Sequence, residues 1–525
     1  MRDIDEANWE FAHRLLQCVA VAYRPLCVEE LADILSFDFK TGPIPGFYES
    51  WRLGDPIDAV LSTTSSLLAI VDDWGSPVIQ FSHFSVKEFL TSIRLAETND
   101  IICRRYHISM TPAHTVAAQA CLGILLHLDI NVVTRDSLGE YPLVEYAARH
   151  WVNHARFEGV SGKVEDGMKR LFDPSKPHLA IWVWIFDLEC FGWNQGSGAE
   201  RPFQPRGSPL HYAVVCGLHT IVEFLIIQHA QDPHSLCFDD ALTPLHLAAR
   251  EGHEDVARVL LGHGADATAQ TNYGSTPLHI AAREGREDIA RILLEHGADL
   301  ASQRKDGWTP LHVASQWGYE EVTSLLLEHG ADSTALTNDG STPLHLVARE
   351  GHEDVARVLL EQGADATAQT NYGTTPLHLA VRGGRKDVAR VLLEHGADMA
   401  SQRKDGWTPL HVASLWGYEE VTSLLLEHGA DATAQTNDGS TPLHIAAREG
   451  HEGVARVLLE HGTDITSQTN DGSTPLHIAS QWGSEEVVLL LLEHGADPTA
   501  ETVDESTPFS LGLEWGEEVL FEHCN

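Results

Sequence analysis

Histidine is the residue with the greatest chemical potential in this chain, because 31 of the 525 residues are histidines. Imidazole nitrogens bind zinc when several of them converge on one point. Fourteen of these histidines belong to two motifs, Thr-Pro-Leu-His and Glu-His-Gly, that recur in register with a period of 33 residues. If each period forms one packed layer of helices, equivalent histidines lie about 10 Å apart, which is too far to share an ion. The sequence therefore predicts no metal site.

The cysteines and the other reactive residues also lack the spacing of known metal-binding, redox or phosphate-binding motifs. The eight cysteines contain no Cys-x-x-Cys pair, and we expect them to be the reduced, buried thiols of an intracellular protein. Neither a His-Glu-x-x-His motif nor a Gly-x-x-x-x-Gly-Lys-Ser/Thr phosphate-binding loop occurs among the 525 residues. We therefore expect no enzymatic activity, no catalytic residues and no cofactor. The cysteines are at positions 18, 27, 103, 121, 190, 216, 237 and 524.

The 33-residue period itself is the strongest structural signal. Thr-Pro-Leu-His occurs eight times, with degenerate versions before and after, and its period and sequence resemble those of ankyrin repeats. The resemblance covers residues 207–525, about ten repeats, and implies an α-solenoid that recognises a partner protein on its concave face. The prolines of the eight motifs are Pro244, Pro277, Pro310, Pro343, Pro376, Pro409, Pro442 and Pro475.

One repeat, residues 275–307, shows how the elements should form. Thr276 is placed to cap a helix that begins at Pro277, where the missing N–H costs nothing. Gly285 should separate this helix from a second one, and Gly297 should end the second helix in a left-handed conformation. Neither helix is long enough to be stable alone, so the stacked array is the folding unit.

A longer period of 99 residues, three repeats, reproduces surface residues as well as core residues. By the ankyrin resemblance, partners contact the residue before Thr-Pro and the two residues before the central glycine. We hypothesise that Trp308 and Trp407, beside Arg304 and Arg403, form two equivalent pockets roughly 30 Å apart. The tryptophans before the central glycine either bind the partner too or pack on the next repeat; they are Trp317, Trp416 and Trp482.

Charge favours a protein partner over nucleic acid. The chain carries 35 Lys and Arg against 76 Asp and Glu, a formal net charge of −41, and such a surface repels phosphate backbones. No apolar run reaches the length of a membrane span, and acidic residues interrupt the first residues where a signal peptide would lie. We expect a cytoplasmic protein, with the nucleus as the alternative.

The residues before position 207 lack the repeat and form one or two separate modules. We predict a winged-helix domain over 1–97, a helical segment over 98–193 and a linker over 194–206. Within the first domain, apolar patterns predict helices over 6–22, 28–35 and 56–66, a hairpin of strands 67–71 and 78–81, and a helix over 84–95. The predicted helix 56–66 contains no Lys or Arg, which argues against insertion into a DNA groove.

Three segments, 15–26, 61–68 and 80–90, closely resemble the winged-helix part of fungal NACHT-ankyrin proteins, which are NLR-like STAND NTPases. The same winged helix occurs in GPI inositol-deacylase-like sequences. In that family a Phe-x-His histidine contacts the nucleotide phosphate, and His83 is the matching residue; with no phosphate-binding loop in the chain, a plain structural role is the alternative.

The resemblance implies the C-terminal part of an NLR-like signalling protein, associated with an NTPase domain in cis or in trans. A general ankyrin scaffold without a signalling role and a fragment of a STAND NTPase are the two alternatives.

Overall fold

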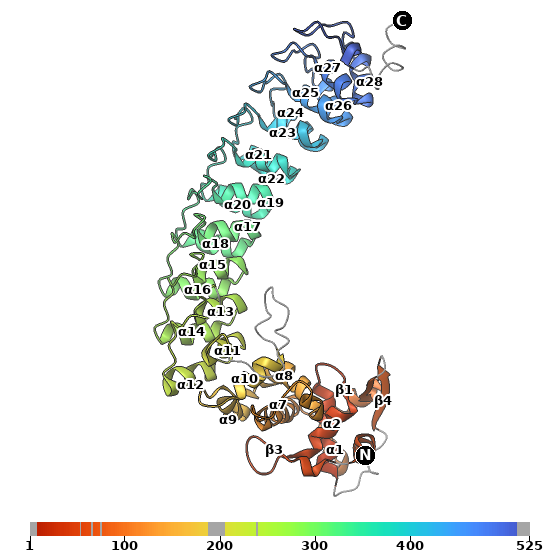
Figure 1. Ribbon diagram of the computed structural model, residues 1–525, viewed down its shortest axis with the longest axis vertical. Helices are drawn as coiled ribbons and strands as arrows, with labels where there is room; N and C mark the ends of the chain where they lie inside the picture. Colours follow the sequence, from red (N-terminus) through yellow and green to blue (C-terminus); the bar gives the residue numbers. More distant parts are fainter. Residues whose placement is uncertain are drawn as a thin grey trace. The chain divides into compact units, whose positions relative to one another are not determined.

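The computed structural model describes residues 8–52, 54–64, 67–73, 76–186, 205–237 and 240–511. It is mostly helical and divides into two compact units, residues 1–266 and 267–525 (Figure 1). The predicted mainly α architecture with a helical repeat array is confirmed. This division falls inside the array, and most of the predicted linker, 194–204, lies outside the described residues. The predicted domain limits therefore stay predictions.

The first unit begins with three helices and a small sheet. Strands β4 and β5 form an antiparallel hairpin with Ile70 opposite Ile79, and the short strand β1, which sequence reasoning missed, pairs with the other edge of β5 to give the order β1-β5-β4. The elements are α1 (Trp9–Val21), β1 (Leu26–Cys27), α2 (Val28–Asp33), η1 (Ile34–Ser36), β2 (Phe37–Asp38), β3 (Gly46–Phe47), η2 (Glu49–Trp51), α3 (Pro56–Thr64), β4 (Leu68–Asp73) and β5 (Ser76–Phe81).

The helix expected over 84–95 is two helices. Helix α4 (Phe84–Leu90) ends at Thr91, and α5 (Ile93–Ala96) begins at Ser92, whose hydroxyl accepts a hydrogen bond from the Leu95 amide at 3.3 Å. A serine in this position satisfies an amide that a continuous helix would bond to its own backbone. The capping hydroxyl therefore explains the division.

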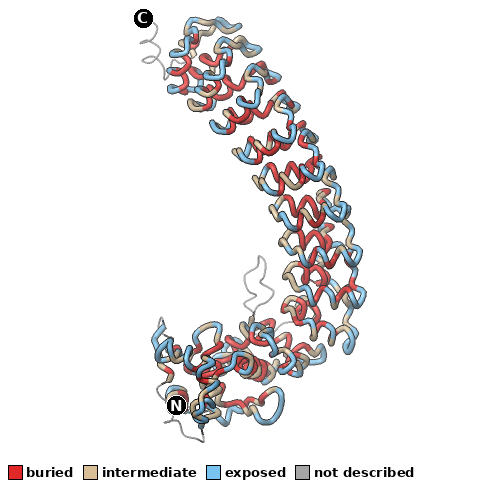
Figure 2. Tube along the Cα trace, turned by 180° about the vertical axis from the view of Figure 1, so that it is seen from behind, coloured by how far each residue is buried: buried red, intermediate tan, exposed pale blue. Residues whose placement is uncertain are grey.

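A bundle of longer helices follows. Helix α7 contributes mostly buried residues, and the indole of Trp182 on α10 packs edge-on against Trp151 at 5.3 Å and donates to the Ala148 carbonyl at 2.9 Å. Trp182 and Trp184 are both fully buried, and buried residues run along the helices of each unit (Figure 2). The helices are α6 (Ile101–Arg104), α7 (Met110–His127), η4 (Ser137–Glu140), α8 (Leu143–Ala155), α9 (Ser161–Phe172) and α10 (His178–Phe186).

The repeats form antiparallel helix pairs. In the first unit these are α11 (Pro209–Val215), α12 (His219–His229), α13 (Pro244–Glu251) and α14 (Glu254–Gly262). In the second unit they are α15 (Pro277–Arg283), α16 (Glu287–Glu295), α17 (Pro310–Trp317), α18 (Glu320–Glu328), α19 (Pro343–Glu350), α20 (Glu353–Glu361), α21 (Pro376–Arg382), α22 (Lys386–Glu394), α23 (Pro409–Trp416), α24 (Glu419–Glu427), α25 (Pro442–Glu449), α26 (Glu452–Glu460), α27 (Pro475–Trp482), α28 (Glu485–Glu493) and α29 (Pro508–Leu511).

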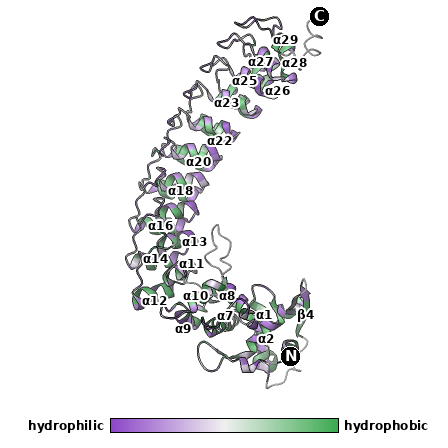
Figure 3. Cartoon of the chain, viewed as in Figure 1, coloured by the Kyte–Doolittle hydropathy of each residue, from purple (hydrophilic) through white to green (hydrophobic). Residues whose placement is uncertain are grey.

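Each repeat follows the local rules that its sequence predicts. In residues 275–307 the Thr276 hydroxyl accepts from the His279 amide at 3.4 Å and Pro277 begins the helix. Gly285 and Gly297 adopt φ values of 66° and 83°, the left-handed conformation expected of helix-ending glycines. Apolar residues face the neighbouring helices, so hydrophobic and hydrophilic residues alternate around each helix (Figure 3). This pattern leaves the turn tips, the helix ends and the outer sides of the second helices accessible.

Candidate functional site

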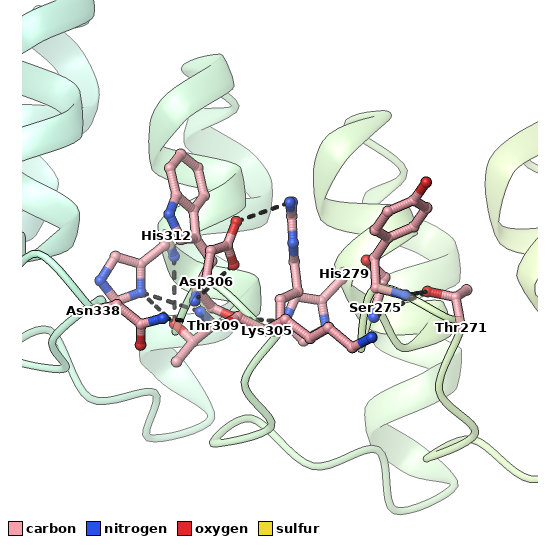
Figure 4. A network of polar contacts seen from close by, with 11 residues as sticks. Thr271, Ser275, His279, Lys305, Asp306, Thr309, His312 and Asn338 are labelled. Atoms are coloured by element: carbon pink, nitrogen blue, oxygen red, sulfur yellow. Dashed lines mark hydrogen bonds and ion pairs between the residues drawn. The ribbon is translucent and has the colours of Figure 1, made fainter. Parts of the chain in front are cut away.

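The Thr-Pro-Leu-His histidines join each repeat to the next. The Nδ1 of His312 accepts the Thr309 amide at 3.2 Å (Figure 4). The ring proton is therefore on Nε2, which donates to the Ser341 carbonyl of the following repeat at 3.2 Å. Burial lowers the pKa of His312 to about 4 and keeps the ring neutral. The same bond to the next repeat is made by His279, His345, His378, His411, His444 and His477.

The turn tips are also joined in a row, which sequence reasoning missed. The backbone amide of Asn338 donates to the Asp306 carbonyl at 3.1 Å, and its Nδ2 donates to the Lys305 carbonyl at 2.9 Å (Figure 4). Asn371, Asn437 and Asn470 repeat this pair of bonds with the tip before each of them. The sequence signal for these bonds was an asparagine that recurs two residues before the glycine of a turn tip. Since the tips hold one another, they present their side chains from a fixed backbone.

Trp308 and Trp407 are half-buried, and each lies near the Thr-Pro-Leu-His histidine of its own repeat. Their rings are 6.3 and 6.0 Å from those of His312 and His411, and the Arg304 guanidinium lies 5.6 Å from the centre of the Trp308 ring. Cation–π contacts of this kind hold an arginine over an indole face. The two predicted sites are therefore alike in their aromatic packing, while the partner-binding role of these tryptophans stays a prediction.

Arg304 and Arg403 are held by an acidic residue of their own turn. Nη2 of Arg304 donates to Asp306 at 3.0 Å, and Arg403 makes the same bond to Asp405 at 3.0 Å. The two arginine side chains remain 31% and 36% exposed. Arg304 also lies over the Trp308 ring, and the two predicted partner-binding pockets stay predictions.

The tryptophans before the central glycines are the more exposed set. Trp317, Trp416 and Trp482 are the last residues of α17, α23 and α27, and they are 55%, 49% and 62% exposed. Packing on the next repeat, one of the two expectations for these residues, would bury them more deeply. Four other repeats have Arg-Glu at the same place, and there the two side chains form an ion pair, as in Arg283 with Glu284 at 2.8 Å.

The residue before each exposed tryptophan differs between the copies. Gln316 donates to Glu350 at 2.7 Å and accepts from Arg349 at 2.6 Å, so it links two repeats by polar contacts. The corresponding residue three repeats later is Leu415, which cannot make these bonds. The second copy therefore presents a more apolar surface beside Trp416.

Two exposed tyrosines of the turn tips were not singled out from the sequence. Tyr273 and Tyr372 are 62% and 68% exposed and lie 99 residues apart. Their carbonyls accept from the amides of Lys305 and Lys404 at 3.1 Å in both copies, so each tyrosine stands next to a cationic tip. Their identical place in the 99-residue period was the available signal.

His83 precedes the first residue of α4. It is exposed at the start of α4, where Nδ1 accepts from the Ser85 amide at 3.2 Å and its ring lies 4.5 Å from Phe84. It therefore acts as a helix cap, and its predicted nucleotide contact stays a prediction. Among the described residues no group of histidines, cysteines and carboxylates is arranged to hold a metal ion. Nor is any helix there long and apolar enough to cross a membrane.

A family-model comparison agrees with the repeat geometry. A family model described as ankyrin repeats in three copies matches residues 210–304, 299–370, 331–403, 363–436 and 432–502. The azaphilone pigments biosynthesis cluster protein L of Monascus ruber is 30% identical over 275 residues, which are 50% of this chain and 57% of that relative. The solved ankyrin repeat domain of Bcl-3, of the IkappaB family, is 33% identical with a TM-score of 0.37, over 39% of this chain and 95% of that one. Ankyrin repeats are protein-interaction modules, and this chain belongs to the ankyrin repeat family.

Proposed function

We propose that this chain is a non-enzymatic binding protein whose array holds a partner protein against its turn tips and first-helix ends. The observation that carries the proposal is the exposure of Trp317, Trp416 and Trp482 at one position of three first helices. The other apolar residues of those helices are buried in the stack, apart from the half-buried Leu415 and Ile478. Large indoles left in water at equivalent places are typical anchors of protein interfaces, where tryptophan is enriched among the energetically dominant residues.

The acidic surface narrows the class of partner. The repeat that contains Trp317, residues 308–340, has five acidic residues and no Lys or Arg. Such a surface repels a nucleic acid, whereas a protein can bind the exposed tryptophans through apolar groups. We therefore expect a protein partner and no nucleic acid.

A triple variant tests this function. Trp317→Ser, Trp416→Ser and Trp482→Ser together should remove the partner from affinity-purified full-length chain, since each anchor is worth about 2 kcal/mol or more. Leu489→Gln is the matched control, because Leu489 is 36% exposed on a second helix of the array. Circular dichroism confirms that both variants fold. If both variants retain the same partners as wild type, the tryptophans are not the anchors and the proposal is wrong.

We further propose that the array serves an NLR-like signalling protein, in which the N-terminal part is the regulatory winged helix. The support is the resemblance of residues 15–26, 61–68 and 80–90, together with the order of three helices, a β-hairpin and a helix in α1 to α4. A scaffold without signalling is the competing function. Sequencing of the gene upstream of the codon for Met1 tests the assignment, with a phosphate-binding loop in frame as the expected result.

A nucleotide-binding assay tests the remaining alternative. We expect no ATP or ADP binding by the purified chain, because its 525 residues include no phosphate-binding loop. Binding that is lost on His83→Ala would assign this chain to the NTPases and would contradict the non-enzymatic proposal.

A further inference from the structure

Only two turn tips of the second unit, among its described residues, carry a positive charge. Both have the sequence Arg-Lys-Asp-Gly, at 304–307 and 403–406, with one more cation than anion. The tips at 337–340, 436–439 and 469–472 read Thr-Asn-Asp-Gly and are negative, and the last, 502–505, carries two acids. The cationic tips therefore stand out against an acidic array at an interval of three repeats.

Each cationic tip is combined with the same aromatic residues. The preceding tip supplies an exposed tyrosine whose carbonyl is bonded to the tip lysine, and the residue after the tip glycine is a half-buried tryptophan. We name the two groups the first patch, Tyr273, Arg304, Lys305 and Trp308, and the second patch, Tyr372, Arg403, Lys404 and Trp407.

The two patches agree in geometry as well as in sequence. The arginine bonds its own turn aspartate at 3.0 Å in both, and a carbonyl of the patch accepts from a Thr-Pro-Leu-His histidine at 3.0 Å in both. Folding needs only the 33-residue pattern, since the Thr-Asn-Asp-Gly tips form the same turn with left-handed glycines. The cation and aromatic residues are thus additions to a turn that forms without them.

Resting on the proposed function, we propose that the array is bivalent: the two patches bind two copies of one short acidic and apolar segment, presented by a partner that is itself repeated or dimeric. The carboxylates of the segment meet the arginine and lysine of a tip, and its apolar side chain packs on the tyrosine and tryptophan. The negative repeat between the patches, 308–340, repels an acidic connection, so the partner's link between the two segments is neutral or basic.

The stacking of the repeats sets the distance between the two patches that a bivalent partner must span. Three layers of helices at about 10 Å each place equivalent patches roughly 30 Å apart. An extended chain covers about 3.3 Å per residue, so a link shorter than about nine residues cannot reach both patches. A flexible link of about 20 Gly and Ser residues has a mean span near 25 Å and can reach both.

Calorimetry with synthetic probes tests bivalency on the full chain. The probes are the peptide acetyl-Glu-Leu-Phe-Glu-amide and tandem peptides with two copies joined by about 4 or about 20 Gly and Ser residues. We expect two sites per chain for the single peptide. The long tandem peptide should bind one to one and about 100-fold more tightly than the single peptide, and the short one should show no such gain.

Matched variants locate the sites. R304T/K305N and R403T/K404N convert each cationic tip to Thr-Asn-Asp-Gly, the sequence already folded at the neighbouring tips. Either variant should leave one site for the single peptide and remove the gain of the long tandem, and their combination should remove both sites. K386N/R390N is the control, because it deletes two cations of α22 that are paired with Glu420 and Asp387.

The remaining results overturn the inference. Absence of binding by the single peptide, one site in wild type, or an equal loss in the α22 control each contradicts two equivalent patches. Loss of inorganic phosphate binding rather than peptide binding in the tip variants would instead assign the patches to a phosphorylated ligand. Failure here is distinguishable from failure of the proposed function, since a chain whose natural partner depends on Trp317, Trp416 and Trp482 but not on the tips refutes bivalency alone.

Discussion

Replacing His312 by glutamine tests whether the bonds between repeats depend on a neutral histidine. The ring is buried, accepts the Thr309 amide on Nδ1 and donates to the Ser341 carbonyl from Nε2. Glutamine can still accept the Thr309 amide at this position of the helix start, but it does not titrate. At about pH 7.5 we expect His312→Gln to lower the free energy of unfolding by about 1–2 kcal/mol through the weakened bond to the next repeat.

The pH dependence follows from the pKa of His312, which burial lowers from 6.5 to about 4. Because the unfolded chain binds this proton more readily, the wild type loses stability as the pH falls from about 6.5 towards 4. Each unit of pKa corresponds to about 1.4 kcal/mol, so the full loss is about 3.4 kcal/mol, of which about 2 kcal/mol has appeared at about pH 5. The glutamine variant has no titrating side chain at position 312 and so does not lose this stability. At about pH 5 it should therefore be as stable as the wild type or more stable.

Urea unfolding followed by far-UV circular dichroism measures both proteins at the two pH values. Comparing them at equal pH cancels the self-repulsion of the acidic surface, and it also cancels the nearby Asp306 and Asp339 as long as these titrate alike in both proteins. His329→Gln is the control, because His329 is exposed and its ring bonds the Leu325 carbonyl of its own helix rather than the next repeat. A stability difference between wild type and His312→Gln that stays constant from about pH 7.5 to 5 would refute the reasoning.

Two further predictions concern backbone and thiols. Gly318→Ala should destabilise the chain by about 2–4 kcal/mol, since residue 318 has a left-handed φ of 76° and a Cβ would lie 2.5 Å from the His352 ring. Gly330→Ala, at φ 88° with open space around the Cβ, should cost only about 1 kcal/mol in the same urea assay. Burial raises the pKa of the Cys18 and Cys216 thiols to about 12. Iodoacetamide at about pH 8 should therefore label these thiols only after unfolding. Mass spectrometry of the two peptides measures the labelling, and labelling of the native chain would contradict the prediction.

The fold of the array could be read from the sequence because every repeat obeys local rules. The cap threonine, the proline at the first helical position and the left-handed glycines each have one favourable conformation, and residues 275–307 adopt it. The short strand β1 could not be read in the same way. It pairs only two residues with β5, so its formation depends on a partner about 50 residues away.

The sequence gives the positions of the tryptophans but does not show how exposed each side chain is. Sequence spacing showed that Trp308 and Trp317 each recur after 99 residues, but it did not show which of the two stays in water. The structure settles this through the turn: the residue after the tip glycine lies against its own histidine, while the last residue of the first helix extends beyond the stack. Exposure depends on the direction of a side chain from a packed element, which periodicity does not determine.

In the proposed binding surface, the exposed tryptophans and the cationic tips have different roles. Trp317, Trp416 and Trp482 expose large apolar side chains, so under the proposed function they contribute affinity with modest discrimination. The cationic tips have little area but a charge opposite to that of the rest of the array, so under the proposed bivalent binding they discriminate between partners and set the register. Because adjacent tips are hydrogen-bonded through their backbones, this register is fixed before the partner arrives, and a partner whose acidic segments have the wrong spacing gains only one of the two patches.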